Sequence, residues 1–174
     1  MIERYYTYTV SHCAKALKYG LYWLINELDK NHAVKGCFLA LGKGNFCNKH
    51  NTYWKEDAIG KSIMTKICKN GYVMINKKKI ELQYPRNLNI SSFTSIVAFY
   101  PNKKLINKIE EEIAFSQGYE KQFLPPNPNA LPKSLLVIPW IEFNVDEWIE
   151  KFNPNKIDIE CPEYYKYGYY RKHR

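Results

Sequence analysis

The segment Ser134–Asn153 constrains the fold most, because its pattern predicts a buried strand, a turn and an amphipathic helix in direct succession. The apolar run Leu135–Ile138 suits a strand that is covered on both faces, as in a parallel sheet with helices on each side. Asn144 can then cap a helix, and Glu147 three residues later completes a capping box. We therefore predict a central strand, with an indole buried beneath it. The apolar helix positions recur at helical spacing and are Val145, Trp148, Ile149 and Phe152.

The rest of the chain alternates apolar strands with amphipathic helices. This alternation predicts an α/β fold with one mostly parallel, Rossmann-like sheet flanked by helices. The short polar connector Asn76–Lys78 predicts a small β-hairpin insertion, and an α+β arrangement is the alternative if that hairpin belongs to a second sheet. The predicted strands are Tyr5–Val10, Lys35–Leu41, Tyr72–Ile75, Lys79–Tyr84, Ile96–Tyr100, Ser134–Ile138 and Lys156–Glu160. The predicted helices cover 11–31, 56–70, 102–113 and 144–153.

The length of 174 residues, of which 45% are hydrophobic, predicts a single domain over residues 1–162. A basic, tyrosine-rich tail over 163–174 follows it. The segment Ser116–Lys133 contains four prolines and is too broken for regular structure. At that length we expect a lid or a partner-facing loop.

No apolar run is long enough to span a membrane, and the amino terminus lacks the pattern of a secretory signal. We therefore expect no membrane association and a location in the cytoplasm of a bacterial or infected host cell. The cysteines are odd in number and form no CxxC pair, which predicts reduced, structural thiols and no zinc site. They are Cys13, Cys37, Cys47, Cys68 and Cys161.

The net charge of +9 is unevenly distributed along the chain. Residues 30–108 carry fifteen basic and three acidic side chains, whereas residues 109–163 carry four and eleven. This asymmetry indicates either a phosphate-bearing partner or a solvated lysine-rich face. The abundance of Lys, Asn, Ile and Tyr is typical of an AT-rich genome, bacterial or viral. It suggests the further hypothesis of a viral or mobile-element accessory protein that sequesters a host component.

Three loops that follow predicted strands have compositions suited to a nucleotide, and ligands of open α/β sheets bind at the carboxyl ends of strands. Glycine amides can approach an anion, a capped helix amino end attracts phosphate, and aromatic rings can stack on a base. Ordinary turns with satisfied caps are the alternative explanation. The predicted ligand-binding residues are Lys43, Gly44, Asn45, Tyr100, Asn102, Lys103, Trp140 and Glu142.

Several motifs are incomplete. Gly60-Lys61-Ser62 is no Walker A loop, because position 55 holds Lys55 where a glycine is needed. The Gly42–Gly44 loop lacks the third glycine of a dinucleotide fingerprint, because position 47 is a cysteine, so we expect no nicotinamide or flavin and no other cofactor. The histidines form no metal-binding pair, so we expect no metal. If there is a general base, Glu142 is the first candidate and His12 the second.

The tail EYYKYGYYRKHR interleaves five tyrosines with four basic residues, as single-strand nucleic-acid binders do. Our leading hypothesis is a non-enzymatic α/β protein that binds a phosphate-bearing ligand, a nucleotide or a nucleotide-derived signal. The alternatives are a nucleic-acid-binding accessory protein that uses residues 30–108 and the tail, and a small hydrolase or nucleotidyl enzyme with Glu142 as base. A protein partner and any oligomeric state stay open. The nucleic-acid candidates are Lys166, Tyr169, Tyr170, Arg171, Lys172 and Arg174.

Overall fold

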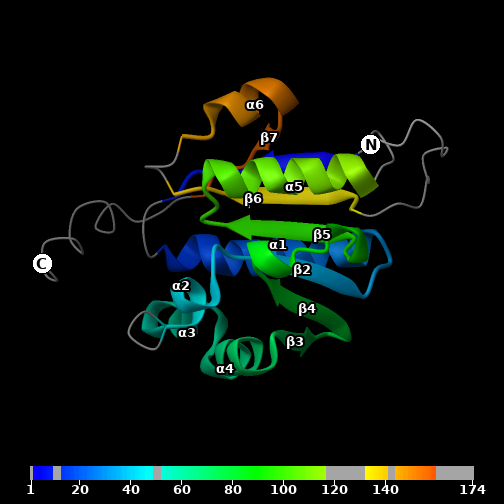
Figure 1. The fold of residues 1–174 in the computed structure, drawn as a ribbon. Helices are drawn as coiled ribbons and strands as arrows, with labels where there is room; N and C mark the ends of the chain where they lie inside the picture. Colours follow the sequence, from blue (N-terminus) through cyan, green and yellow to red (C-terminus); the bar gives the residue numbers. More distant parts are fainter. Residues whose placement is uncertain (1, 10–12, 49–51, 117–131, 141–143, 160–174) are drawn as a thin grey trace, which may run out of the picture.

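A seven-stranded sheet organises the chain in the computed structural model, which describes residues 2–9, 13–48, 52–116, 132–140 and 144–159. The strand order is β3-β4-β2-β5-β6-β1-β7, and all neighbours pair in parallel except β3 and β4 (Figure 1). The prediction of a mostly parallel α/β sheet flanked by helices is confirmed. The strands are β1 (Glu3–Tyr6), β2 (Lys35–Leu39), β3 (Tyr72–Ile75), β4 (Lys78–Gln83), β5 (Ser95–Phe99), β6 (Ser134–Ile138) and β7 (Asn155–Lys156).

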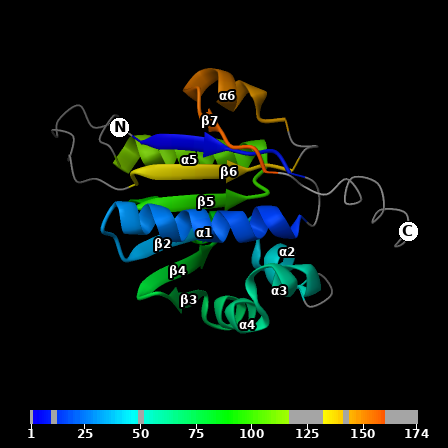
Figure 2. The ribbon, with the colours of Figure 1, turned by 180° about the vertical axis from the view of Figure 1, so that it is seen from behind.

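Helices cover both faces of this sheet (Figures 1 and 2). One core cluster joins the sheet to α1, α2, α3 and α4, and the other joins the opposite face to α5, α6 and a short turn before β5. Alternate strand residues enter opposite cores, as the pleat requires: Phe38 faces α1 and Cys37 faces the α5 side. The helices are α1 (Ala14–Lys30), α2 (Lys43–Cys47), α3 (Tyr53–Ile59), α4 (Lys61–Asn70), α5 (Lys103–Ser116) and α6 (Asp146–Phe152), with 3-10 turns η2 (Pro85–Asn87) and η3 (Ile90–Ser92).

The predicted segment around β6 has the predicted structure. β6 lies between β5 and β1, and all five of its residues are buried. Trp148 of α6 is 6% exposed and packs in the same core as Leu135 and Val137, so the prediction that it lies buried beneath the central strand is confirmed. The helix cap differs from the predicted capping box. The Asn144 Oδ1 accepts the backbone N–H of Asp146 at 2.8 Å, whereas the Glu147 carboxylate binds a lysine of α5.

The hairpin of β3 and β4 is antiparallel as predicted and joins the main sheet, because β4 also pairs with β2. Asn76 and Lys77 have φ angles of 48° and 64°, the conformation of a two-residue hairpin turn with both central residues left-handed. The predicted helix over 56–70 is two helices. Gly60 has a φ of 93°, which separates α3 from α4, and Gly71 with a φ of 77° ends α4.

Two other expectations need correction. The predicted first strand to Val10 ends at Tyr6, and beyond it Thr9 makes only an isolated bridge to Trp140. Val10 lies outside the described residues, as do 117–131 of the expected lid and 160–174, which include the tail. The segment Gly42–Asn45 is not a loop throughout, because α2 begins at Lys43.

The expectation of reduced cysteines is wrong for Cys47 and Cys68, which form a disulfide with Cα atoms 5.6 Å apart. Twenty-one residues separate them in sequence, and only the packing of α2 near α4 brings them together. Cys13 is disulfide-bonded as well, whereas Cys37 is a buried free thiol. Among the helices that the structure describes, none has the length and apolar character of a membrane span.

Candidate functional site

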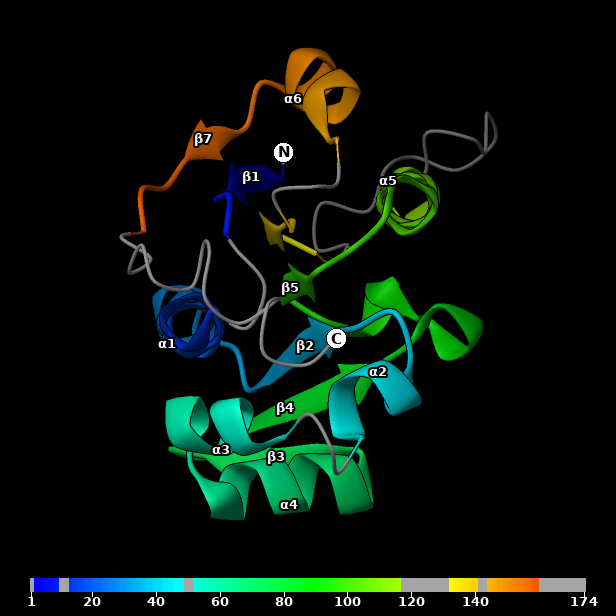
Figure 3. The ribbon, with the colours of Figure 1, turned by 90° about the vertical axis from the view of Figure 1, so that its left-hand side faces the viewer.

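Three predicted ligand loops leave the sheet at the same edge. β2, β5 and β6 are adjacent and parallel, with Leu39 level with Ala98 and Ala98 level with Val137. The segments after Leu39, Phe99 and Ile138 therefore start from one carboxyl edge, which faces the viewer in Figure 3. These strand ends share one edge, as the parallel pairing requires.

The connections from β2 and β5 diverge at this edge. After β2 the chain enters α2, which packs with α1 on one face, and after β5 it enters α5 on the other face. Neighbouring parallel strands whose connections leave on opposite faces form the crevice in which open α/β sheets bind ligands. β6 and β1 repeat the arrangement, because α6 and α1 lie on opposite faces. The edge between β2 and β5 is the candidate site, because the predicted ligand residues Lys43–Asn45 and Tyr100–Lys103 follow these two strands.

Tyr100 follows β5 directly and has an unusual backbone. Its φ is 52°, a left-handed conformation that costs a bulky residue roughly 1–3 kcal/mol and persists only where surrounding contacts enforce it. Its N–H donates to the Ile138 carbonyl at 2.9 Å, and its hydroxyl accepts the Cys13 N–H at 3.4 Å. The ring stacks on Phe99 with centroids 4.1 Å apart and lies 6.5 Å from the Trp140 ring. Two aromatic rings thus flank the end of β5.

Asn102 and Lys103 begin α5. The Asn102 Oδ1 accepts the N–H of Leu105 at 2.9 Å, so this side chain caps the helix, as predicted. Its amide oxygen is therefore already engaged within the protein. The Lys103 ammonium lies 2.8 Å from the Glu147 carboxylate, and both side chains are exposed. A phosphate would have to compete with that carboxylate for Lys103. Lys103 and Glu147 line a cavity of about 220 Å³ between α5 and α6. The lining residues are Lys103, Ile106, Asn107, Asn144, Val145, Glu147 and Trp148.

Lys43, Gly44 and Asn45 form the first turn of α2 and are exposed. Among the described residues no carboxylate forms an ion pair with Lys43. A Cβ built on Gly42 or Gly44 would meet no heavy atom within 4 Å, so open space surrounds this backbone. Among the described residues, Lys103 is paired with a carboxylate and Lys43 is not.

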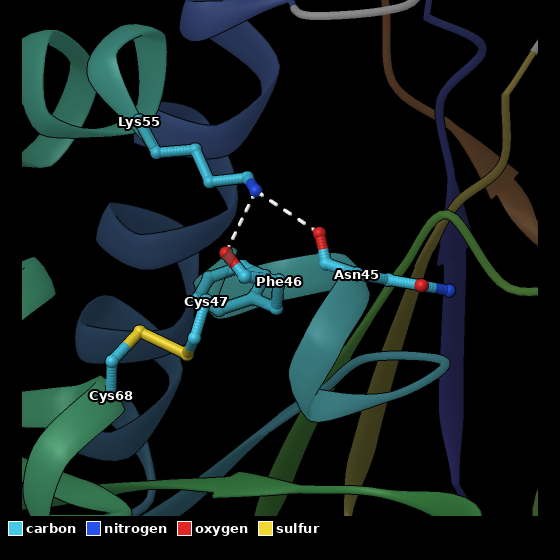
Figure 4. The surroundings of a disulfide bond; sticks show 5 residues. All are labelled: Asn45, Phe46, Cys47, Lys55 and Cys68. Carbon is cyan, nitrogen blue, oxygen red and sulfur yellow. Dashed lines mark hydrogen bonds between the residues drawn. A yellow bond between two sulfur atoms is a disulfide. The ribbon is translucent and has the colours of Figure 1, made fainter. Parts of the chain in front are cut away.

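A buried lysine holds the other end of α2 (Figure 4). Lys55 of α3 is 3% exposed, and its ammonium donates to the carbonyl oxygens of Asn45 at 3.3 Å and Phe46 at 2.8 Å. Its Nζ also lies 5.1 Å from the Phe46 ring and 5.3 Å from the Trp54 ring. Burial lowers the pKa of Lys55 to about 8, because desolvation disfavours the charged form.

Sequence reasoning missed this part of the site. Phe46 and Trp54 fall in a segment whose polar composition predicted a loop, yet both are buried, with Phe99 6.5 Å from the Phe46 ring and 6.3 Å from the Trp54 ring. Two aromatic residues within that loop were the available signal. Nothing in the sequence marks Lys55, because its burial depends on how α2 and α3 pack.

Other predicted residues lie outside the described structure. These are the candidate bases Glu142 and His12 and the nucleic-acid candidates of the tail, Lys166, Tyr169, Tyr170, Arg171, Lys172 and Arg174. Within the described ranges, no cluster of His, Cys, Asp and Glu is suited to a metal ion. Comparisons of the chain with protein-family models, curated proteins and solved structures give no match.

Proposed function

We propose that this protein binds a phosphate-bearing ligand, a nucleotide or a nucleotide-derived signal, at the carboxyl edge between β2 and β5, without catalysis. The observation that supports the proposal is that β2, β5 and β6, which Gly42–Asn45, Tyr100 and Trp140 follow in the chain, end at one edge of the sheet, where the connections from β2 and β5 diverge. The segments come from positions up to about a hundred residues apart in the chain, and crevices of this kind are where parallel α/β sheets hold ligands.

The residues at this edge supply the chemistry that such a ligand needs. The exposed Lys43 ammonium provides a positive charge beside glycine backbone with open space around it. The amino end of the 14-residue helix α5 opens toward the same edge and favours negative charge. Tyr100 and Trp140, whose ring centroids lie 6.5 Å apart, supply the aromatic side chains that a base requires for stacking.

A thermal-shift panel tests the proposal, because a ligand that binds only the folded state raises the melting temperature. The panel contains nucleoside mono-, di- and triphosphates, cyclic dinucleotides, the matching nucleosides and inorganic phosphate. Affinity for any compound that raises the melting temperature is then measured by calorimetry. We expect phosphorylated compounds to raise it and the nucleosides to do so less, because Lys43 recognises the phosphate.

Lys43→Glu is the decisive variant, and Lys66→Glu, which reverses an exposed charge on α4, is its matched control. Both should change the free energy of unfolding by only about 0.5 kcal/mol, as exposed substitutions do. We expect Lys43→Glu to weaken binding by at least about tenfold, the equivalent of 1.4 kcal/mol, and Lys66→Glu to leave it unchanged. A panel without any stabilising compound, or equal affinities of the two variants, would overturn the proposal.

A further inference from the structure

We propose that the Cys47–Cys68 disulfide is a redox-controlled latch, whose reduction releases α2 and thereby lowers affinity at the candidate site. The effect on affinity rests on the proposed function, whereas the release of α2 does not. α2 carries Lys43, Gly44 and Asn45, and its last residue, Cys47, is bonded to α4. The ligand-facing residues and the disulfide therefore belong to one short element.

α2 depends on tertiary anchors for its position. It contains five residues and has no side-chain hydrogen bond at its amino cap. Helices this short are not stable in isolation, because nucleation costs more than the few backbone hydrogen bonds return. Three described anchors hold α2, namely the buried Phe46 ring, the hydrogen bonds from Lys55 and the disulfide. The disulfide is the one covalent anchor among them, and it ties α2 to α4.

The bond is accessible to a reductant. Cys47 and Cys68 are each only partly buried, whereas the free thiol of Cys37 is fully buried, and burial strongly raises its pKa. A thiolate of a dithiol reductant attacks one sulfur and forms a mixed disulfide, and the second thiol of the reductant resolves it. Two electrons and two protons pass to the protein, which gains two cysteine thiols, and the reductant leaves as a disulfide. Cytoplasm, the compartment expected from the sequence, contains such dithiols.

Hydrogen exchange at the backbone amides of α2 tests the latch without any ligand. The comparison uses the oxidised full-length chain, the same chain reduced by a dithiol, and the variant Cys47→Ser/Cys68→Ser. The double variant is needed because Cys13 is disulfide-bonded as well and would be reduced in the same treatment. Cys37→Ser is the control, since it removes a buried thiol outside the latch.

We expect exchange of the Phe46 and Cys47 amides, the first in α2 that can donate within the helix, to accelerate by at least about tenfold in the reduced chain and in the double variant, with β5 and β6 still protected. The affinity for the compound that best stabilises the oxidised protein should fall by at least about fivefold. Unchanged exchange in α2 would overturn the latch, and so would loss of protection throughout β5 and β6, because the bond would then hold the whole fold. Faster exchange with equal affinity in both redox forms would overturn the control of binding. Faster exchange with no stabilising compound at all would leave the release of α2 supported and the proposed function refuted.

Discussion

The guanidinium of Arg4 and the carboxylate of Glu110 form two hydrogen bonds, of 3.0 and 2.7 Å, across 106 residues of sequence. The side chains are 16% and 11% exposed, and the same carboxylate accepts the Trp148 indole N–H at 2.8 Å. Arg4 also lies over the Phe152 ring, 4.4 Å from its centroid. One carboxylate thus connects β1, α5 and α6 on the face of the sheet opposite α1.

Glu110→Gln should lower the free energy of unfolding by roughly 1–3 kcal/mol. The amide cannot accept both guanidinium bonds with full charge, and a shielded Arg4 without its counter-charge is costly. Glu111→Gln, on the exposed face of the same helix, should change stability by less than about 0.5 kcal/mol. Urea unfolding followed by circular dichroism measures both variants, and equal midpoints would contradict the role given to Glu110.

Trp148→Ala should cost roughly 3–5 kcal/mol, because it removes a large buried side chain and leaves a cavity between α6 and the sheet. Trp148→Phe should cost less, since a smaller aromatic ring still fills part of the space, although the hydrogen bond to Glu110 is lost. Thermal and urea unfolding check the order of the two variants. If both variants lose the same free energy of unfolding, the hydrogen bond rather than the packing holds α6 in place.

Lys55 should make a contribution to the free energy of unfolding that increases as the pH rises from about 8 to 10. Its pKa is lowered to about 8 in the folded state, whereas an unfolded lysine titrates near 10.5, so in this interval the unfolded chain binds more protons and alkalinity favours folding. Lys55→Met should remove this rise, and Lys66→Met should retain it. Unfolding free energies at a series of pH values measure the slope. The same slope in both variants would show that Lys55 keeps its ordinary pKa.

Two glycines, Gly36 within β2 and Gly42 at the start of α2, should respond differently to alanine. A Cβ at Gly36 would lie 3.0 Å from the terminal methyl carbons of both Leu24 and Leu28, so these buried side chains would have to move by a few tenths of an ångström. Gly36→Ala should therefore destabilise the fold by roughly 1–3 kcal/mol. Gly42→Ala meets no atom within 4 Å and has an extended φ of −176°, so we expect a change below about 0.5 kcal/mol. Thermal unfolding distinguishes the two.

The sequence predicted the elements whose apolar pattern was continuous. β6 and α6 were recognisable because Leu135–Ile138 is wholly apolar and Trp148 recurs at helical spacing with its neighbours. The helix over 56–70 was predicted with its end at Gly71, but the break at Gly60 was missed, because a glycine inside a helical pattern does not reveal its own φ angle. The first strand was also predicted to continue to Val10, whereas β1 ends at Tyr6.

For the candidate site, parallel pairing of β2, β5 and β6 was enough to predict that their loops share an edge. What each side chain does there depends on neighbours that no local pattern reveals. Lys103 was predicted to face a ligand, yet it pairs with Glu147, 44 residues away. The disulfide of Cys47 and Cys68 and the burial of Lys55 likewise follow from the packing of α2 against α3 and α4.

The place of β1 in the strand order also affects the order in which the strands can pair during translation. In the described sheet β1 pairs with β6 and β7, so its residues have no partner strand until residues 134–138 have been made. β2, β4 and β5 lie within 65 residues of one another and can pair long before that. Domains begin to fold during translation, and pairings between distant segments form late. We therefore expect β1 to pair after the middle of the sheet has assembled. β1 precedes the other strands of the sheet in the chain and is among the last to be incorporated.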